Sequence, residues 1–295
     1  MNENRFRAGY VAIVGKPNVG KSTLLNAFLD FKLSIVTPKP QTTRKKILGI
    51  LNGANYQMVF IDTPGWITPH YELQKFMMHY LQESLQDADL VLLMVEYSDP
   101  PQELEQIGQK IATLQKKTIL VINKIDKIQK EQLLPIIADY QKRFTFTEYV
   151  PISALQGDGV KLLLQEILEK LPEHPAYFPK DYASDQNERF FVTEIIREKI
   201  FQMFAKEIPY ACHVELEEFK EQRGRKDLIR AIIYVDHDSQ KGIIIGKAGQ
   251  ALKKVGEQAR KDIETFLQRE VYLELFVRVM ENWRKKSAAL KKLGY

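Results

Sequence analysis

The chain has 295 residues, of which 44% are hydrophobic and 27% charged, so it can bury a sizeable core. Its length suggests two domains. A single cysteine, Cys212, excludes an internal disulfide and a zinc cluster and is expected to be a small buried filler. The formal charge of +5 comes from residues 186–295, with 22 Lys+Arg against 17 Asp+Glu, because residues 1–185 carry 21 of each. This basic bias suits nucleic acid, an anionic membrane face or an ordinary solvated surface.

No targeting or membrane segment is expected. The first seven residues, MNENRFR, contain no apolar stretch of the kind found in a signal peptide, and no apolar run approaches the length of a membrane span. The sequence therefore predicts a cytoplasmic protein.

The first motif lies between an apolar run, residues 10–14, and a helix-forming run, residues 23–29. It follows the GxxxxGK[ST] pattern and reads Gly15, Lys16, Pro17, Asn18, Val19, Gly20, Lys21 and Ser22, with Thr23 counted in the same site. Its glycines let several backbone N–H groups point at one anion beside the positive end of the helix dipole. We expect Lys21 to reach the outer phosphates of a nucleotide and the Ser22 hydroxyl to ligate Mg²⁺.

Residues 31–48 are polar and contain two prolines, and they predict a loop that carries Thr42 and Thr43. In a nucleotide switch, one threonine would place its hydroxyl on magnesium and its N–H on the terminal phosphate; a solvated turn is the alternative. Residues 47–51 and 56–61 then predict a strand hairpin that ends in Asp62, Thr63, Pro64 and Gly65. Asp62 is expected to hold the magnesium shell through water, and Gly65 to offer an N–H to the terminal phosphate.

Two further buried strands, residues 90–95 and 118–122, flank a helix near residues 103–115. The second strand ends in Asn123, Lys124, Ile125 and Asp126. A carboxylate at Asp126 can accept hydrogen bonds from the ring N–H and exocyclic amine of guanine, a donor pair that adenine lacks. Lys124 would lie along the base plane.

The last nucleotide motif is Ser153, Ala154 and Leu155, where the Ala154 N–H is expected to approach the guanine oxygen. A helix over residues 159–171 closes the domain. Strands and helices that alternate in this way predict an α/β fold with a doubly wound, mostly parallel sheet, which binds ligands at the strand ends.

Taken together, these motifs resemble those of the translation-factor branch of P-loop GTPases over residues 8–172. The resemblance implies that Thr43 is the magnesium ligand beside Ser22 and Asp62, and that Lys21, Thr43 and Gly65 are the catalytic residues. One position departs from the pattern, because Trp66 stands where many relatives have a glutamine that orients the attacking water. An indole cannot do this, so slow intrinsic hydrolysis is expected unless another group supplies the stabilisation. The family pattern implies K⁺ bound with the help of Asn18; a purely structural role for Asn18 is the alternative.

Three prolines in residues 172–179 predict a linker, with a GTPase domain at 1–175, the linker at 176–186 and a second domain at 187–295. In the second domain, periodicity predicts helices over residues 188–205 and 251–267, and strands over 212–219, 228–235 and 271–279. A basic terminal helix is expected from Trp283 to Lys292, and solvent, RNA or anionic lipid are its candidate neighbours.

Before the second helix lies a GxxG motif after an isoleucine triplet, in an order of elements that resembles an α+β type II KH domain over residues 187–281. The predicted RNA-binding residues are Gly242, Ile243, Ile244, Gly246, Lys247, Ala248, Gly249 and Gln250. The glycines would let helix ends approach a sugar-phosphate backbone, and an apolar groove beside Ile244 would take unstacked bases.

A single GTPase domain followed by a KH domain resembles the Era GTPase family over nearly the whole chain. The resemblance implies a monomer that hydrolyses GTP to GDP with Mg²⁺, binds the 3′ end of 16S rRNA, assists assembly of the small (30S) ribosomal subunit and contacts the inner face of the cell membrane peripherally. Three alternatives stay open: an RNA-binding module with incidental hydrolysis, a membrane-surface GTPase, and an adenine-nucleotide enzyme.

Overall fold

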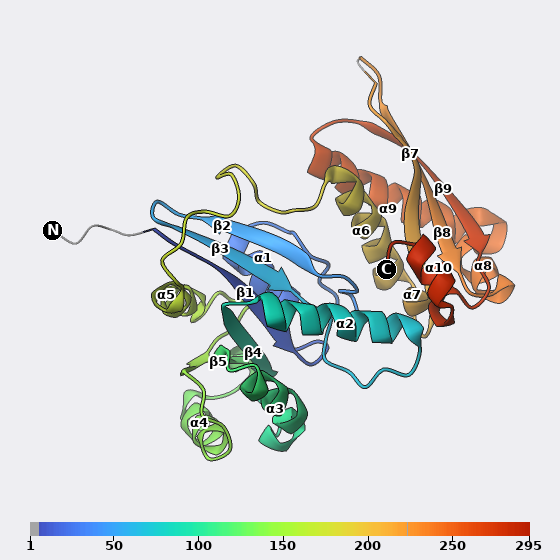
Figure 1. The fold of residues 1–295 in the computed structure, drawn as a ribbon. Coiled ribbons are helices and arrows are strands. Elements are labelled where there is room, and N and C mark those ends of the chain that lie inside the picture. Colours follow the sequence, from blue (N-terminus) through green and yellow to red (C-terminus); the bar gives the residue numbers. More distant parts are fainter. Residues whose placement is uncertain (1–5, 223) are drawn as a thin grey trace. The chain divides into compact units, whose positions relative to one another are not determined.

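The computed structural model describes residues 6–222 and 224–295, so the first five residues of the N-terminal segment considered above lie outside it. The described chain divides into two compact units (Figure 1). The first comprises the chain up to Ser34 with Pro40–Thr68 and Met77–Asp185, and the second comprises Ile35–Lys39, Pro69–Phe76 and Gln186–Tyr295. Across the described ranges, each helix is too short or too polar to cross a membrane.

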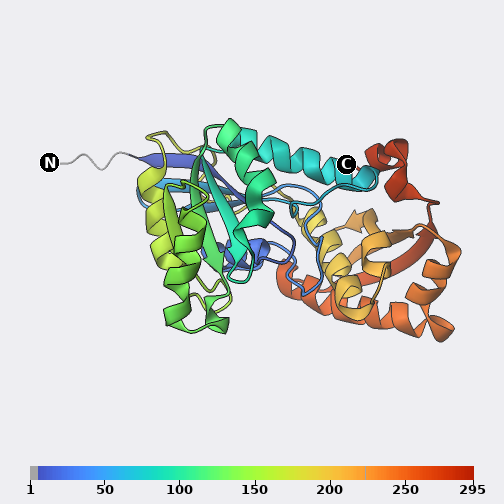
Figure 2. The ribbon, with the colours of Figure 1, turned by 90° about the horizontal axis from the view of Figure 1, so that it is seen from below.

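The first unit is built on a six-stranded sheet with the strand order β2-β3-β1-β4-β5-β6. Only β2 runs antiparallel, to β3, so the prediction of a mostly parallel sheet is confirmed. The strands are β1 (Arg7–Gly15), β2 (Ile47–Asn52), β3 (Tyr56–Asp62), β4 (Leu90–Glu96), β5 (Lys117–Asn123) and β6 (Glu148–Pro151). Helices cover both faces (Figure 2), which explains why β1, β4 and β5 are almost continuously apolar.

Four helices belong to the connections between these strands: α1 (Lys21–Leu29), α2 (Glu72–Asp87), α3 (Glu105–Thr113) and α4 (Leu133–Gln141). A fifth helix, α5 (Val160–Lys170), follows the last strand, β6. The sequence predicted α1, α3 and α5. It also carries a signal for α2 that was missed, because Leu73, Met77, Leu81 and Leu85 recur every fourth residue and are all buried.

The segment predicted as a linker lies against β2 and β3. The Gln57 side chain is fully buried and accepts hydrogen bonds from the N–H groups of Tyr177 and Phe178 at 2.7 and 2.9 Å. Further along, the Ser184 hydroxyl donates to the Leu48 carbonyl at 2.6 Å. The compact first unit therefore extends to Asp185, beyond the predicted domain end at residue 175.

The second unit has a three-stranded sheet in the order β7-β8-β9, with β7 antiparallel and β9 parallel to β8. Its elements are α6 (Glu188–Met203), α7 (Ile208–Ala211), β7 (His213–Lys220), β8 (Asp227–Val235), α8 (Asp238–Ile245), α9 (Gln250–Leu267), β9 (Val271–Val279) and α10 (Ser287–Lys292). The predicted order of helices and strands is confirmed. Helices α6 and α9 pack against each other and against the sheet.

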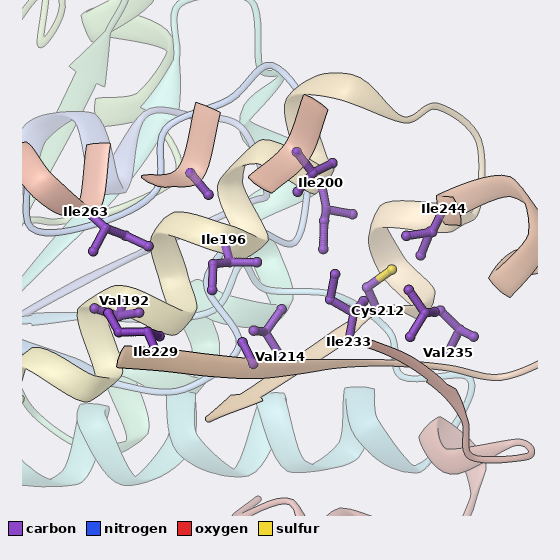
Figure 3. Packing of buried hydrophobic residues seen from close by; sticks show 14 of the residues in the cluster. Val192, Ile196, Ile200, Cys212, Val214, Ile229, Ile233, Val235, Ile244 and Ile263 are labelled. Atoms are coloured by element: carbon purple, nitrogen blue, oxygen red, sulfur yellow. The ribbon is translucent and has the colours of Figure 1, made fainter. Parts of the chain in front are cut away.

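The core of this unit lies between the sheet and these helices (Figure 3). Val192, Ile196 and Ile200 of α6 point into it, and Cys212 is buried there as expected. The prediction of one basic helix from Trp283 was wrong. Trp283 is fully buried and donates its indole N–H to the Ala211 carbonyl at 2.8 Å, so the chain makes a short 3-10 turn there before α10.

Candidate functional site

The GxxxxGKS loop connects the end of β1 to the start of α1, as predicted. Gly20 caps α1 with a φ of 103°, a left-handed conformation that favours glycine. A Cβ atom at Gly20 would lie 2.3 Å from the Asn123 side-chain nitrogen. The loop therefore needs glycine at this position for its backbone conformation and for the close approach of Asn123.

Lys21 lies at the centre of the loop and is only 6% exposed. Its ammonium group donates hydrogen bonds to the Gly15 carbonyl at 3.2 Å and to the Lys16 carbonyl at 2.8 Å. Burial lowers the pKa of Lys21 to about 8, although the nearby Asp62 carboxylate opposes this shift. Phosphate oxygens could replace the two carbonyls as partners, and their charge would favour the protonated amine.

Three oxygen-bearing side chains converge beside Lys21. The Ser22 hydroxyl donates to Asp62 Oδ2 at 2.8 Å, the Thr43 hydroxyl donates to the same oxygen at 3.2 Å, and the two hydroxyls are 3.1 Å apart. The structure thus brings together the three predicted magnesium-site residues and selects Thr43 for this cluster.

This cluster fits a small divalent cation. Asp62 is fully buried, and within the described residues its Oδ1 atom has no hydrogen-bond partner. Desolvation raises the pKa of Asp62, while hydrogen bonds from Ser22 and Thr43 and the charge of Lys21 act in the opposite direction. Carboxylate and hydroxyl oxygens are hard ligands that suit Mg²⁺, and a cation would compensate the buried carboxylate.

The Asp62–Gly65 segment lies against the phosphate loop. The Thr63 hydroxyl donates to the Ile13 carbonyl at 2.7 Å, and the Trp66 N–H donates to the Gly15 carbonyl at 2.9 Å. A Cβ atom at Gly65 would approach the Pro17 nitrogen to 2.7 Å, so only glycine fits here. The contact of the Gly65 N–H with a terminal phosphate remains a prediction.

Asn123 joins the phosphate loop to the predicted base-binding segments. Its side-chain amide donates to the Val19 carbonyl at 2.7 Å and accepts from the Ala154 N–H at 2.9 Å. Next to it, Asp126 accepts a hydrogen bond of 2.6 Å from Ser153. Three motifs that are far apart in sequence thus meet at the carboxyl edge of the parallel sheet.

Two predicted nucleotide-binding residues make contacts within the protein at this edge. The Ala154 N–H donates to Asn123 Oδ1 because the two strand ends lie side by side, and its approach to a guanine oxygen stays a prediction. The side chain of Lys16, another residue of the phosphate loop, pairs with Asp99 at 3.2 Å and with Glu103. The Lys16 side chain therefore faces the segment before α3, and its nucleotide contact is predicted for the backbone of the loop. Leu155 is 76% exposed and lies at the outer end of the segment.

Sequence reasoning missed two acidic residues at the end of β4. Glu96 pairs with Lys124, and Asp99 accepts a hydrogen bond of 2.8 Å from the Glu96 N–H while it pairs with Lys16. The sequence carries no local signal for these contacts, because they depend on the strand order: β4 lies between β1 and β5 in the sheet, so its carboxyl end adjoins both lysine-bearing loops.

The second candidate site is the turn between α8 and α9. Gly246 and Gly249 have φ values of 71° and 76°, and Ala248 between them has 49°. Lys247 and Ala248 are exposed. A Cβ atom at Gly246 would come within 2.6 Å of the Ala251 Cβ, so this glycine lets the two helix ends approach each other as predicted.

A groove of about 510 Å³ continues from this turn between α9 and β9. Strand β9 is at the edge of the sheet. The lining residues are Gly249, Leu252, Lys253, Gly256, Glu257, Arg260, Tyr272, Leu273 and Leu275. The predicted groove residue Ile244 is instead fully buried in the core, because α8 turns this side chain toward the sheet, while its neighbour Ile243 is half exposed. Ile244 thus supports the site from within.

The fold and the two sites define a P-loop GTPase domain that is followed by a KH domain. A family profile described as a 50S ribosome-binding GTPase matches residues 10–124, and a KH-domain profile matches residues 207–284. The GTPase Era of Geobacter metallireducens is 49% identical over the whole length of both chains. That of Syntrophus aciditrophicus is 48% identical over 98% of this chain and 95% of its own.

The chain belongs to the Era family of GTPases. A solved structure of Era in complex with MgGDPNP and nucleotides 1506–1542 of 16S ribosomal RNA is 42% identical, with a TM-score of 0.94 over 98% of this chain and 99% of that one. An Aquifex aeolicus Era bound to GDP.AlF4− has the same identity, coverage and TM-score.

Proposed function

We propose that this GTPase is an Mg²⁺-dependent switch that binds single-stranded RNA at the 3′ end of 16S rRNA and assists assembly of the small ribosomal subunit. The switch is supported by the hydrogen bonds that join Ser22, Thr43 and Asp62. Thr43 belongs to a loop, whereas Ser22 lies in α1 and Asp62 at the end of β3, so a ligand at this cluster would order the loop against the two elements. The RNA target is supported by the Era structure that contains MgGDPNP and a segment of 16S rRNA.

Each residue of the nucleotide site then has a defined task. Mg²⁺, when bound, would neutralise charge on the phosphates of GTP, as in other phosphoryl-transfer sites. Ser22 and Thr43 would supply ligand oxygens, and Asp62 would hold the metal shell in place through water. Lys21 would place its positive charge on the outer phosphates. Asn123 would hold the phosphate loop, through Val19, against the base-binding segment, through Ala154.

The KH unit offers chemistry that suits an unpaired strand. The GxxG turn exposes Lys247 to a phosphate. The groove beyond it is lined by apolar side chains of α9 and β9 and by the charged residues Lys253, Glu257 and Arg260. Bases of single-stranded RNA have flat apolar faces and can enter such a groove, whereas a duplex would hide them.

Coupling between the sites would start at the two nucleotide-responsive segments. The second compact unit includes residues 35–39 and 69–76. Thr43 lies four residues after the end of the first segment, and Gly65 lies four residues before the start of the second. Ordering Thr43 and Gly65 around GTP would therefore act on both units through short stretches of chain.

A monovalent cation would supply the stabilisation of GTP hydrolysis that Trp66 cannot provide. The side chain of Trp66 has one donor and no acceptor, so it cannot orient water as a glutamine does. Asn18 is exposed at the tip of the phosphate loop with a φ of 65°, and this position supports a role of its carbonyl oxygen in binding K⁺ beside the phosphates. Both points favour K⁺ as a second cofactor.

The proposal is tested with a double variant, Lys247→Asp with Ala248→Asp, which places two carboxylates on exposed positions of the GxxG turn and keeps both of its glycines. We expect its affinity for an oligonucleotide of the 16S rRNA 3′ end to fall at least about 100-fold, because like charges oppose the phosphates. Its affinity for GDP should stay unchanged. Unaltered RNA binding would contradict the assigned RNA site, and equal RNA affinity of the wild type with GTP analogue, with GDP and without nucleotide would contradict the switch.

A further inference from the structure

Gly256 occupies an unfavourable place for a glycine, the middle of the 18-residue helix α9. Packing within the protein does not require it. A Cβ atom there would meet only the Leu275 side chain, at 3.5 and 4.0 Å, which is ordinary van der Waals contact. At Gly20 and Gly246, by contrast, a Cβ atom would clash at 2.3 and 2.6 Å. The fold itself would therefore accept alanine at position 256.

The missing side chain opens the groove between α9 and β9. Gly256 lies four residues after Leu252 and four before Arg260, so all three lie on one face of the helix, and all three line the groove. Leu273 and Leu275 of β9 lie among the lining residues on the other side. A side chain at position 256 would project into the groove at the middle of this row.

The surroundings indicate what would occupy this space. Leu252 and Leu275 offer apolar contact on either side of Gly256. The charged lining residues are Lys253, Glu257 and Arg260; because Glu257 pairs with Lys253 at 4.0 Å, the positive charge of Arg260 is left in excess. A ligand that suits both features has a flat apolar ring attached to an anionic backbone. Without a Cβ atom, the backbone of α9 is accessible to the face of such a ring.

We propose that Gly256 is a specificity-determining residue at which one unpaired base of the bound RNA packs face-on against the α9 backbone, between Leu252 and Leu275. This inference rests on the proposed RNA-binding function. It implies that the glycine lowers the stability of the helix in return for room in the groove.

The test compares Gly256→Ala and Gly256→Leu with a matched control, Thr265→Ala, which improves helix propensity at an exposed position of α9 outside the groove. Unfolding by denaturant and binding of a 16S rRNA 3′-end oligonucleotide are measured for each. Gly256→Ala should lower the unfolding equilibrium constant about two- to fivefold, yet weaken RNA binding about tenfold. Gly256→Leu should weaken it further, and Thr265→Ala should leave it unchanged.

The outcomes separate this inference from the function on which it rests. If the wild type binds RNA, the Lys247→Asp/Ala248→Asp variant does not, and Gly256→Ala binds like wild type, the inference is overturned and the RNA-binding function stands. If Gly256→Ala is less stable than wild type, the fold itself needs the glycine and the inference is also overturned. If the wild type does not bind the RNA, both are overturned.

Discussion

Asn123 provides the most direct test of how the nucleotide site is held together. It is 3% exposed, and the residues at the other ends of its two hydrogen bonds, Val19 and Ala154, are 3% and 4% exposed. Asn123→Ala would leave a buried carbonyl oxygen and a buried N–H without partners. Each unsatisfied group costs about 1–3 kcal/mol, so we expect a total loss of roughly 3 kcal/mol.

This loss should appear mainly as weaker nucleotide binding, because the two backbone groups belong to the phosphate loop and to the segment that follows β6. A loss of about 2.7 kcal/mol corresponds to a roughly 100-fold higher Kd for GDP, with most of the change in the dissociation rate. Titration and displacement of a fluorescent GDP derivative measure both quantities. RNA affinity without nucleotide should not change, since the GxxG turn lies in the other unit.

Asn187→Ala is the matched control. This asparagine also bonds a backbone N–H, that of Phe190 at 3.0 Å, but it caps α6 in the second unit. Its removal should cost about 1 kcal/mol of stability and leave GDP binding unchanged. If Asn123→Ala bound GDP within threefold of wild type while remaining folded, the hydrogen bonds of Asn123 would not organise the site.

Four further predictions concern residues of the nucleotide site. Asp126→Asn should shift the preference from guanine to xanthine nucleotides, because an amide can donate to the xanthine oxygen; competition between GTP and XTP measures this, and an unchanged preference would remove Asp126 from base recognition. Since the pKa of Lys21 is about 8, GDP affinity should be constant below that pH and fall toward about tenfold per pH unit above it; a constant affinity up to about pH 9.5 would show that its charge is dispensable. The pKa of Lys21 is about 8 in the folded protein and 10.5 for an ordinary lysine, so between these two pH values the unfolded chain binds more protons. The free energy of unfolding of the nucleotide-free protein should therefore rise with pH from about 8 to 10.5. GTP turnover should be faster in K⁺ than in Na⁺, and Asn18→Ala should abolish the difference; equal rates of the wild type in both salts would exclude K⁺ as a cofactor.

The sequence alone determined those features that depend on neighbouring residues. Alternating apolar runs and helix-forming segments predicted the order of most elements, because hydrophobic periodicity reflects local burial. The phosphate loop, Asp62 to Gly65, Asn123 to Asp126 and the GxxG turn were recognisable because each places its chemistry within a few consecutive residues.

Only the tertiary structure decided which distant residues meet. The parallel pairing of β1, β4 and β5 brings Asn123 to Val19 and places Glu96 beside Lys124, contacts that no local pattern contains. The same holds for the second unit. There the packing of α8 buries Ile244, and the packing of α9 beside β9 places Gly256 in the groove. The physical reason is that strand register and helix packing depend on the whole core, whereas a motif depends only on its own backbone.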